Sequence, residues 1–509
     1  MAPTSIHSLR GLLLSQILVH LAIAHSPQEA QLPIHSHNHH DQNHNHNPKH
    51  NDSRQRQKQA YSHDRGDDES CLPGPLLHPK HPTCVTEIFI SDEPSSEFSP
   101  WTHEPFCAPG SDKEAEYLYC VFTNAKYPSP DKGLSIIANP ADPGTEKSLS
   151  ALATLFESLT NPDSPHKNNL QAKSSKKQEP STPGYQVTPI KGKGMGLVAT
   201  RKVRKGQVIM VDYAALLAET VFPSKVKRDV GRELLERAVK RLPVQRRQLV
   251  LGLAGSGTDL KGRRRTDGGD EANVEDLVKT NSFTVEVGGG SFMALFPRIA
   301  RINHACKPSA FTRFDEKTLS NTVLAFRDIS KGEEITISYS EFGLTHPERT
   351  RLLPLKWNFK CTCSLCTSSP TEIQASDTRR AKVKALGPQV ISQVQSGNFA
   401  TAIELNKEMV ELMHIEGLVP HRGEHWEVMA RLLLAEANKL ATRARSTGKD
   451  GEDASGESLR ERGRALVKEA KRYLGLAIEE IEEFGGSWGS DEVEGEEKIE
   501  ELRGWLAKL

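Results

Sequence analysis

Four cysteines that lie far apart in the sequence have the chemistry of one metal site. Cys361, Cys363 and Cys366 crowd into the segment CTCSLC, whereas Cys306 stands alone in RINHACKPSA. A structural zinc ion is held by four thiolate or imidazole ligands in a tetrahedron, so a cluster of three cysteines needs a fourth ligand from elsewhere in the fold. A lone cysteine can also be an inert residue of the core. Because the cluster lacks one ligand, we predict a zinc site made of all four cysteines.

The remaining four of the eight cysteines precede this site and indicate a different chemistry. They are Cys71, Cys84, Cys107 and Cys120. Their spacing is unlike that of a zinc finger, and an even number of cysteines after a secretion signal is typical of disulfides. We therefore predict two disulfides within this set, for which three pairings are possible.

The N-terminal segment GLLLSQILVHLAIA is the predicted secretion signal; it is apolar, follows Arg10 and ends at Ala24. Its length and flanking residues are those of a signal peptide, and Gln16 and His20 interrupt it too much for a stable membrane span. We expect cleavage after Ala24 and entry into the secretory pathway. The alternative is a short amphipathic segment or a misassigned start of the reading frame, and the protein would then lie in the nucleus or cytoplasm.

The overall composition narrows the class of protein. The 66 basic and 66 acidic residues give a formal net charge of zero, so no general attraction to nucleic acid or to an anionic membrane is indicated. With 509 residues the chain is long enough for two or three domains, but its 36% hydrophobic content is low for a chain that is folded throughout. Residues 35–50 are rich in His and Asn, and we interpret them as a solvated tail rather than a defined metal site.

Strands and helices must bring the later cysteines and their neighbours together. From Tyr185, the segment YQVTPIKGKGMGLVATRKVRKGQVIMVD predicts two or three short strands, and strand composition returns in SFTVEVG, NTVLAFRDI and EEITISY. Between these strands, apolar residues keep a helical period over 225–242, and a second helix follows Pro243. After Cys366 the pattern is helical to the end, as in the stripe of Phe399, Ala402, Ile403, Val410 and Met413.

Four motifs in order resemble those of the SET-domain protein lysine methyltransferases. They are KGKGMGLVATRKVRKGQVI, RINHACKP, KGEEITISY and NFKCTCSLC, and they cover about residues 185–366. The CxCxxC spacing and the helical C-terminal region are similar to the SET-and-MYND branch, but residues 213–300 hold no cysteine, so the MYND finger of that branch is missing there. The chain thus resembles a fungal-type SET protein with an N-terminal extension. The resemblance implies an α+β fold class: a SET fold of small curved β-sheets with a pseudoknot and a helical insert, followed by an all-α C-terminal region.

The resemblance also implies cofactors and site residues. It implies S-adenosylmethionine as the methyl donor, a zinc ion shared between Cys306 and the three post-SET cysteines, and Tyr339 as the catalytic residue. The positions that match the family's cofactor-binding motifs are Lys193, Gly194, Met195, Gly196, Asn303, His304, Tyr339 and Phe359. The sequence departs from the family's NHSCxPN motif at Ala305 and Ser309, which replace the Ser and the final Asn.

These residue types suit methyl transfer to an amine. Glycine lets the backbone approach a ligand without a side-chain clash. An attacking lysine must be neutral, although its free pKa is about 10.4, so burial in an apolar channel must lower that pKa. The hydroxyl of Tyr339 can then orient the amine. We expect a protein lysine N-methyltransferase acting on a histone or non-histone protein, and the alternative is a non-catalytic SET-fold protein-interaction module.

The expected organisation follows from these segments. It comprises a signal-peptide-like segment (1–24), a disordered His/Asn-rich tract (25–70), a small cysteine-containing accessory region (71–145), a linker (146–184), a SET domain (185–345) with a helical insert at about 213–280, a post-SET zinc segment (346–370) and a helical, tetratricopeptide-like C-terminal domain (371–509). We expect a protein substrate with a target lysine as the main partner, and the helical domain offers a surface for a protein partner. Neither direct nucleic-acid binding nor a stable membrane span is indicated.

Overall fold

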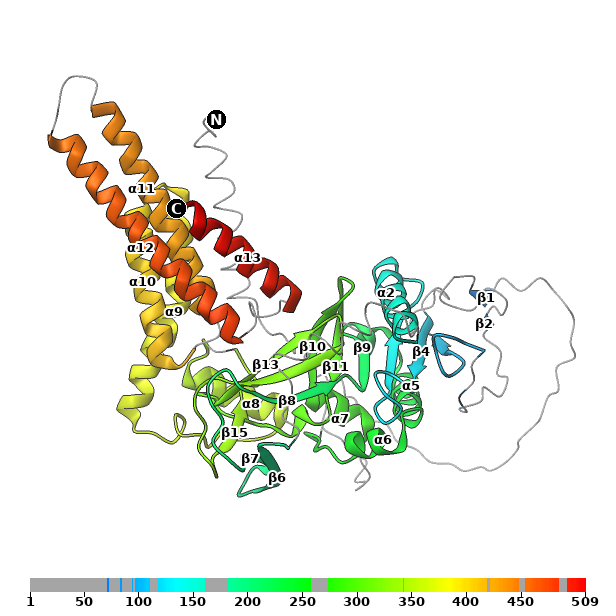
Figure 1. The fold of residues 1–509 in the computed structure, drawn as a ribbon. Coiled ribbons are helices and arrows are strands. Elements are labelled where there is room, and N and C mark those ends of the chain that lie inside the picture. The colour runs from blue at the N-terminus through cyan, green and yellow to red at the C-terminus, as the bar shows by residue number, and fades with distance from the viewer. Residues whose placement is uncertain are drawn as a thin grey trace, which may run out of the picture.

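A computed structural model describes residues 71–72, 83–84, 94, 97–109, 118–160, 182–257, 273–341, 343–418, 422–447, 454–484 and 492–509. The predicted signal segment, the His/Asn-rich tract and residues 161–181 of the expected linker lie outside the described residues. Small sheets form one part of the molecule, and long helices project from it (Figure 1). This arrangement confirms the predicted fold class. In the described part of the chain, no helix combines the length and the apolar character needed to cross a bilayer.

The largest sheet has six strands, and it joins segments from both sides of the expected linker. Its order is β10 (Ser282–Val287), β11 (Gly290–Leu295), β9 (Leu216–Glu219), β5 (Leu134–Ala138), β4 (Leu118–Asn124) and β3 (Phe106–Pro109). The β5–β9 pair is parallel and the other pairs are antiparallel. Every residue of β4, β5 and β9 is buried, as expected for strands covered on both faces. The cysteine-containing region and the insert of the SET region therefore build one sheet, while the expected division into domains stays a prediction.

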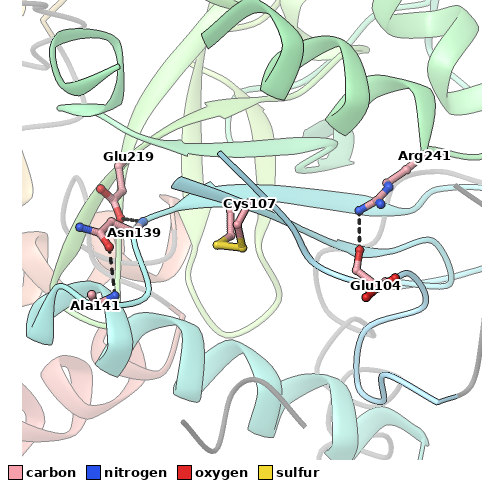
Figure 2. The surroundings of a disulfide bond; sticks show 7 residues. Glu104, Cys107, Asn139, Ala141, Glu219 and Arg241 are labelled. Atoms are coloured by element: carbon pink, nitrogen blue, oxygen red, sulfur yellow. Dashed lines mark hydrogen bonds between the residues drawn. A yellow bond between two sulfur atoms is a disulfide. The ribbon is translucent and has the colours of Figure 1, made fainter. Parts of the chain in front are cut away.

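One of the two predicted disulfides lies in this sheet. Cys107 of β3 and Cys120 of β4 are direct register partners and form a disulfide (Figure 2). Within the same sheet, Glu219 at the end of β9 accepts a hydrogen bond at 2.8 Å from the backbone N–H of Asn139, which directly follows β5, so this bond joins two neighbouring strands. The short strands β1 (Cys71–Leu72) and β2 (Thr83–Cys84) pair with Cys71 opposite Cys84 in backbone register. Because Cys107 and Cys120 are bonded to each other, Cys71 and Cys84 are the two N-terminal cysteines left for the second predicted disulfide.

Helices cover both faces of the six-stranded sheet. On one side lies α2 (Pro143–Thr160), and on the other lie α4 (Phe222–Lys225), α5 (Arg228–Lys240), α6 (Val244–Leu251) and α7 (Val274–Asn281). The prediction of one helix over 225–242 was wrong at its start, because Val226 takes an extended conformation and separates α4 from α5. Val226 is nevertheless buried, so the apolar stripe was read correctly as a packing face.

Two smaller sheets carry the motifs of interest. The first has the order β12 (Asn303–His304), β15 (Glu334–Ile337), β7 (Gly194–Ala199) and β6 (Tyr185–Ile190), and the second has the order β13 (Ala310–Asp315), β14 (Ser320–Ala325) and β8 (Val208–Tyr213). The β12–β15 pair is parallel. The chain leaves β12, builds β13 and β14 in the other sheet, and returns as β15 beside β12. This crossing brings RINHACKP next to KGEEITISY.

The C-terminal third of the chain is helical, as predicted. After α8 (His346–Trp357) come α9 (Pro370–Gln395), α10 (Phe399–Glu416), α11 (Arg422–Thr447), α12 (Ala454–Phe484) and α13 (Glu492–Lys508). Four residues of the predicted stripe on α10 are buried in a common helical core, and Val410 is partly buried. The far end of α12 docks on the second small sheet, where Phe484 packs edge-on against Phe311 at 5.5 Å and its carbonyl accepts a hydrogen bond from Arg313. The likeness to tetratricopeptide repeats stays a prediction.

Candidate active site and metal centre

The four cysteines predicted to share a metal meet in one cluster. Cys306 follows β12, and the other three lie in the turn between α8 and α9. All four Sγ atoms lie within 4.8 Å of one another, and Cys306 Sγ is 3.5 Å from Cys366 Sγ and 3.9 Å from Cys361 Sγ. Sulfurs bound at about 2.3 Å around a tetrahedral zinc ion are about 3.8 Å apart, so this donor set fits zinc in both its chemistry and its spacing. Cys306 and Cys363 are buried, and the other two are partly buried.

A cleft of about 330 Å³ lies beside the cluster and collects most of the predicted cofactor residues. Its volume is within the range of small-molecule sites. The predicted residues that line it are Lys193, Gly194, Met195, Asn303, His304, Tyr339 and Phe359. They come from the β6–β7 turn, from β12, from the segment after β15 and from the segment after α8, so the crossing of the chain assembles them.

The two predicted glycines do different things. Gly194 has φ +73°, a left-handed conformation, and a Cβ there would meet nothing within 4 Å, which leaves its side of the cleft open. Gly196 does not line the cleft. A Cβ on Gly196 would lie 2.6 Å from Nδ2 of Asn303 and 2.7 Å from Cγ1 of Ile190, so this glycine admits a neighbouring side chain rather than a ligand.

Tyr339 lies where the cleft meets the strand crossing. Its hydroxyl donates a hydrogen bond to the carbonyl oxygen of Ile302 at 2.6 Å. Its ring packs against Trp357, with ring centroids 5.4 Å apart, and edge-on against Phe359 at 6.2 Å. Burial, and then the negative charge of Glu334, raise the pKa of Tyr339 well above its ordinary value. The hydroxyl therefore stays protonated at physiological pH and can both donate and accept hydrogen bonds.

His304 connects Tyr339 with the cysteine cluster. Its Nδ1 accepts a hydrogen bond from the backbone N–H of Tyr339 at 3.0 Å, so in the neutral ring the proton sits on Nε2. Nε2 lies 3.3 Å from Cys306 Sγ and donates to it. Burial lowers the pKa of His304 to about 4, which keeps the ring neutral. The imidazole thus contacts the Cys306 sulfur on one side and the backbone of the tyrosine on the other.

Glu334 binds two residues that line the cleft, although the sequence analysis did not single it out. Its Oε2 is 2.6 Å from Lys193 Nζ, and its Oε1 accepts a hydrogen bond from Asn303 Nδ2 at 3.0 Å. The carboxylate therefore ties the glycine-rich turn to β12. Because the side chains of the ion pair are 19% and 23% exposed, water screens their attraction and its role is mainly geometric.

Ser309 maintains the strand crossing despite its departure from the family motif. Its hydroxyl accepts a hydrogen bond from the backbone N–H of Thr336 at 2.9 Å, and its own N–H donates to the Thr336 carbonyl at 3.1 Å. Ser309 is fully buried. The shorter side chain thus keeps the segment after β12 fixed to β15.

Part of the cleft wall escaped the sequence analysis. It consists of residues 252–255 after α6, residues 280–284 at the junction of α7 and β10, residues 299–302, and Trp357. Only Trp357 carried a usable signal, as a second aromatic residue in KWNFKC beside the cysteines. The other segments are far from the cysteines in sequence or lack a spacing that marks a ligand site.

Comparison with known proteins places these features in context. The family model of the SET domain matches residues 194–340 of this chain. The chain is 25% identical over 233 residues to the histone-lysine N-methyltransferase set5 of Schizosaccharomyces pombe, covering 46% of this chain and 66% of that protein. It is 39% identical over 82 residues to the Arabidopsis thaliana histone-lysine N-methyltransferase ATXR2, which covers 16% of this chain and 17% of that protein. It is 38% identical over 95 residues to the human histone-lysine N-methyltransferase SMYD3, which covers 18% of this chain and 21% of that protein. None of these three alignments reaches two thirds of the relative's length.

Proposed function

We propose, from the SET domain that this chain carries at residues 194–340, that it is a protein lysine N-methyltransferase that takes its methyl group from S-adenosylmethionine. One observation carries the proposal: β12 lies parallel to β15, and this pairing gathers Asn303, His304 and Tyr339 at one cleft. Relatives named as histone-lysine and N-lysine methyltransferases support it. The substrate is a lysine side chain of a histone or non-histone protein.

The residues proposed to hold the cofactor are those around the cleft. The open space above Gly194 accommodates a ligand, Phe359 offers an aromatic face for adenine, and the backbone and amide of Asn303 offer polar groups. When bound, S-adenosylmethionine supplies a methyl group on a positively charged sulfur, which a neutral amine can accept by direct displacement. The role of the protein is to align that amine and to exclude water.

Tyr339 is the proposed catalytic residue, and it acts by positioning. Its hydroxyl hydrogen is engaged by the Ile302 carbonyl at 2.6 Å, so the lone pairs of the oxygen are free to accept an N–H of the substrate amine. Because its pKa is raised, it is a phenol rather than a phenolate and is no strong base at neutral pH. The aromatic walls of Trp357 and Phe359 lower the polarity around the amine, which favours the neutral form of the lysine.

Zinc is the proposed second cofactor, held by Cys306, Cys361, Cys363 and Cys366. The spacing of the four sulfurs supports this proposal. The ion would fix the segment after α8, and with it Phe359, against β12. Its role is structural, because all four ligands come from the protein and no position is left open for a reactant.

The proposal is tested by cofactor binding and methyl transfer. Calorimetry with S-adenosylmethionine should detect binding to the purified chain, and mass spectrometry should detect 14-Da additions on core histones or a library of lysine-containing peptides, about 14 Da being the mass of a methylene unit gained. A chain that binds no S-adenosylmethionine would instead support the non-catalytic interaction module, with the helical region as the partner surface.

A matched pair of variants isolates the role of the hydroxyl. Tyr339→Phe should slow methyl transfer by about 100-fold or more while leaving cofactor affinity nearly unchanged. Tyr127→Phe is the control, because the Tyr127 hydroxyl also donates to a backbone carbonyl, that of Thr318, at 2.6 Å, but does not line the cleft. Equal transfer rates in the two variants would contradict the assignment of Tyr339.

A further inference from the structure

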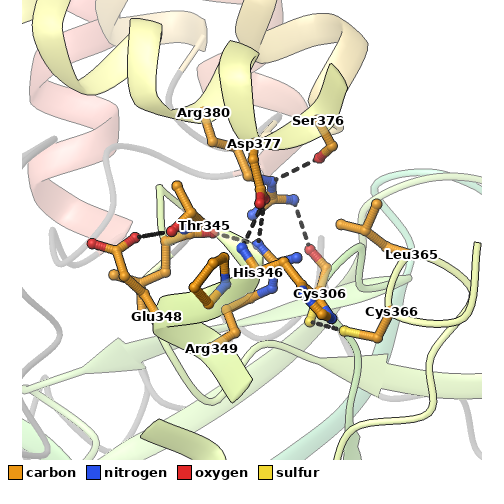
Figure 3. Close-up of polar contacts among 12 residues, drawn as sticks. Cys306, Thr345, His346, Glu348, Arg349, Leu365, Cys366, Ser376, Asp377 and Arg380 are labelled. Atoms are coloured by element: carbon orange, nitrogen blue, oxygen red, sulfur yellow. Dashed lines mark hydrogen bonds and ion pairs between the residues drawn. The ribbon is translucent and has the colours of Figure 1, made fainter. Parts of the chain in front are cut away.

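We propose that Arg380 of α9 is a positioning residue of the metal site, supplying the charge and the hydrogen bond that hold Cys306 and its partner thiolates around zinc. The inference rests on the zinc site proposed above. It makes the helical region part of the metal centre, so that retention of the metal depends on the docking of α9. Figure 3 shows Arg380 in contact with Ser376 on one side and with Cys306 on the other.

The guanidinium of Arg380 is fixed between two parts of the fold. Nη2 donates a hydrogen bond to the carbonyl oxygen of Cys306 at 3.0 Å. On the opposite side, Nε lies 2.9 Å from Oε2 of Glu416 on α10 and 3.3 Å from the hydroxyl of Ser376. The side chains of Arg380 and Glu416 are 1% and 0% exposed, so water does not screen these contacts. The geometry is that of a clamp from two helices onto the backbone of the lone metal ligand.

The charges around the clamp leave a positive excess that faces the cysteines. In the ion pairs of the described residues, Arg349, Arg379 and Arg380 share two carboxylates, those of Asp377 and Glu416. A divalent zinc ion bound by four thiolates carries an excess of negative charge. Because burying an uncompensated charge is costly, the arginines and a zinc–thiolate complex stabilise each other, whereas four neutral thiols would leave the excess unbalanced.

The buried side chain of Arg349 on α8 indicates independently that a further hydrogen-bond acceptor lies nearby. Its side chain is 1% exposed, its Nη1 donates to the carbonyl of Leu344 and lies 3.8 Å from Asp377 Oδ1. Its Nε and Nη2 are buried without a hydrogen-bond partner among the described residues. Unpaired buried donors of this kind call for a hydrogen-bond acceptor beside them, such as a water molecule or a thiolate, that the described residues do not provide.

The clamp also connects the helical region to the cleft. Arg380 holds the carbonyl of Cys306, whose sulfur lies 3.3 Å from His304 Nε2. His304 in turn accepts the backbone N–H of Tyr339 at 3.0 Å. Through this sequence of contacts, loosening Arg380 changes the metal site first and the position of the tyrosine second.

The experiment compares two adjacent arginines in the full-length chain. Arg379 also binds Glu416, with Nε 2.6 Å from Oε1, but its side chain is 28% exposed, and no hydrogen bond among the described residues joins it to Cys306. Zinc release is followed as absorbance of the chelator 4-(2-pyridylazo)resorcinol under native conditions. Arg380→Gln should release zinc about 10–100-fold faster than the unmodified chain, the usual effect of removing a group that orients a metal ligand. Arg379→Gln should release it at nearly the unmodified rate.

Cobalt substitution gives a readout that a general loss of stability would not produce. In the Co²⁺-loaded chain, Arg380→Gln should shift the thiolate-to-metal absorption bands, and Arg379→Gln should not. If Arg380→Gln does not fold, Arg380→Lys, which keeps the charge but loses the planar fork, should still release zinc faster than Arg379→Gln. Equal release rates and spectra for the variants at the two positions would overturn the inference. An unmodified chain that holds no zinc would instead refute the zinc site itself.

Discussion

Replacing Gly196 by alanine tests whether the strand crossing positions Asn303. The new Cβ would lie 2.6 Å from Asn303 Nδ2 and 2.7 Å from Ile190 Cγ1. Non-bonded heavy atoms normally approach to about 3.5–4.0 Å, so both neighbours must retreat by roughly 1 Å. Such a shift stretches the hydrogen bond from Asn303 to Glu334 from 3.0 Å to a length at which it no longer contributes.

The size of the effect follows from these contacts. A hydrogen bond to a charged group contributes about 1.5–3 kcal/mol, and the lower end applies because the side chain of Glu334 is 19% exposed. Overpacking adds about 1–3 kcal/mol. We therefore predict that Gly196→Ala lowers the free energy of unfolding by about 2.5–4.5 kcal/mol and the Tm by at least about 4 °C. The affinity for S-adenosylmethionine should fall as well, because Asn303 lines the cleft.

Alanine substitutions at two other glycines are controls that distinguish a steric clash from backbone strain. Gly194→Ala places a side chain at φ +73° in open space, so we expect only the strain of about 1–2 kcal/mol. Gly343→Ala meets nothing within 4 Å and has no positive φ, so it should leave the Tm unchanged. Thermal melts followed by circular dichroism, together with calorimetric titration of the cofactor, give both quantities. If Gly196→Ala melted and bound like Gly343→Ala, the close contact between β7 and Asn303 would be refuted.

Three further predictions concern the metal, the pH dependence and the N-terminal cysteines. Cys306→Ser should lose one zinc ion relative to the unmodified chain in native mass spectrometry, and an unchanged zinc count would contradict the four-cysteine site. Burial and the charge of Glu334 raise the pKa of Tyr339, so its neutral hydroxyl persists to higher pH than that of a free tyrosine. The value of kcat/KM should therefore rise with pH as the substrate lysine deprotonates, and a fall in kcat/KM that begins below about pH 9 would count against this reasoning. Non-reducing peptide mapping should find Cys107 linked to Cys120 and a second bridge between the two cysteines upstream, with a mature N-terminus after Ala24; an intact Met1 with free thiols would place the protein in the nucleus or cytoplasm.

Some of the site could be predicted because it depends on residue type and order. Three cysteines within six residues lack a fourth ligand, and this deficit alone pointed to Cys306, which the fold brings to within 3.5 Å of Cys366. Apolar periodicity likewise predicted the C-terminal helices, since a stripe at helical spacing must be buried somewhere. The motifs in order predicted the cleft residues, of which only Gly196 proved to act through a neighbouring side chain rather than on the cleft.

Tertiary structure decided the rest, because the partners are distant and chemically ordinary. Nothing near Leu134–Ala138 indicates that β5 pairs in parallel with β9, some eighty residues later, since backbone hydrogen bonds carry no residue signature. The carbonyl of Ile302, which engages the Tyr339 hydroxyl, is likewise invisible in a sequence. The same is true of Arg380. In the sequence it is one of many charged residues, and only the docking of α9 buries it and places it in hydrogen-bond contact with Cys306. Residue types set which chemistry this protein can perform, and the long-range packing sets which atoms meet to perform it.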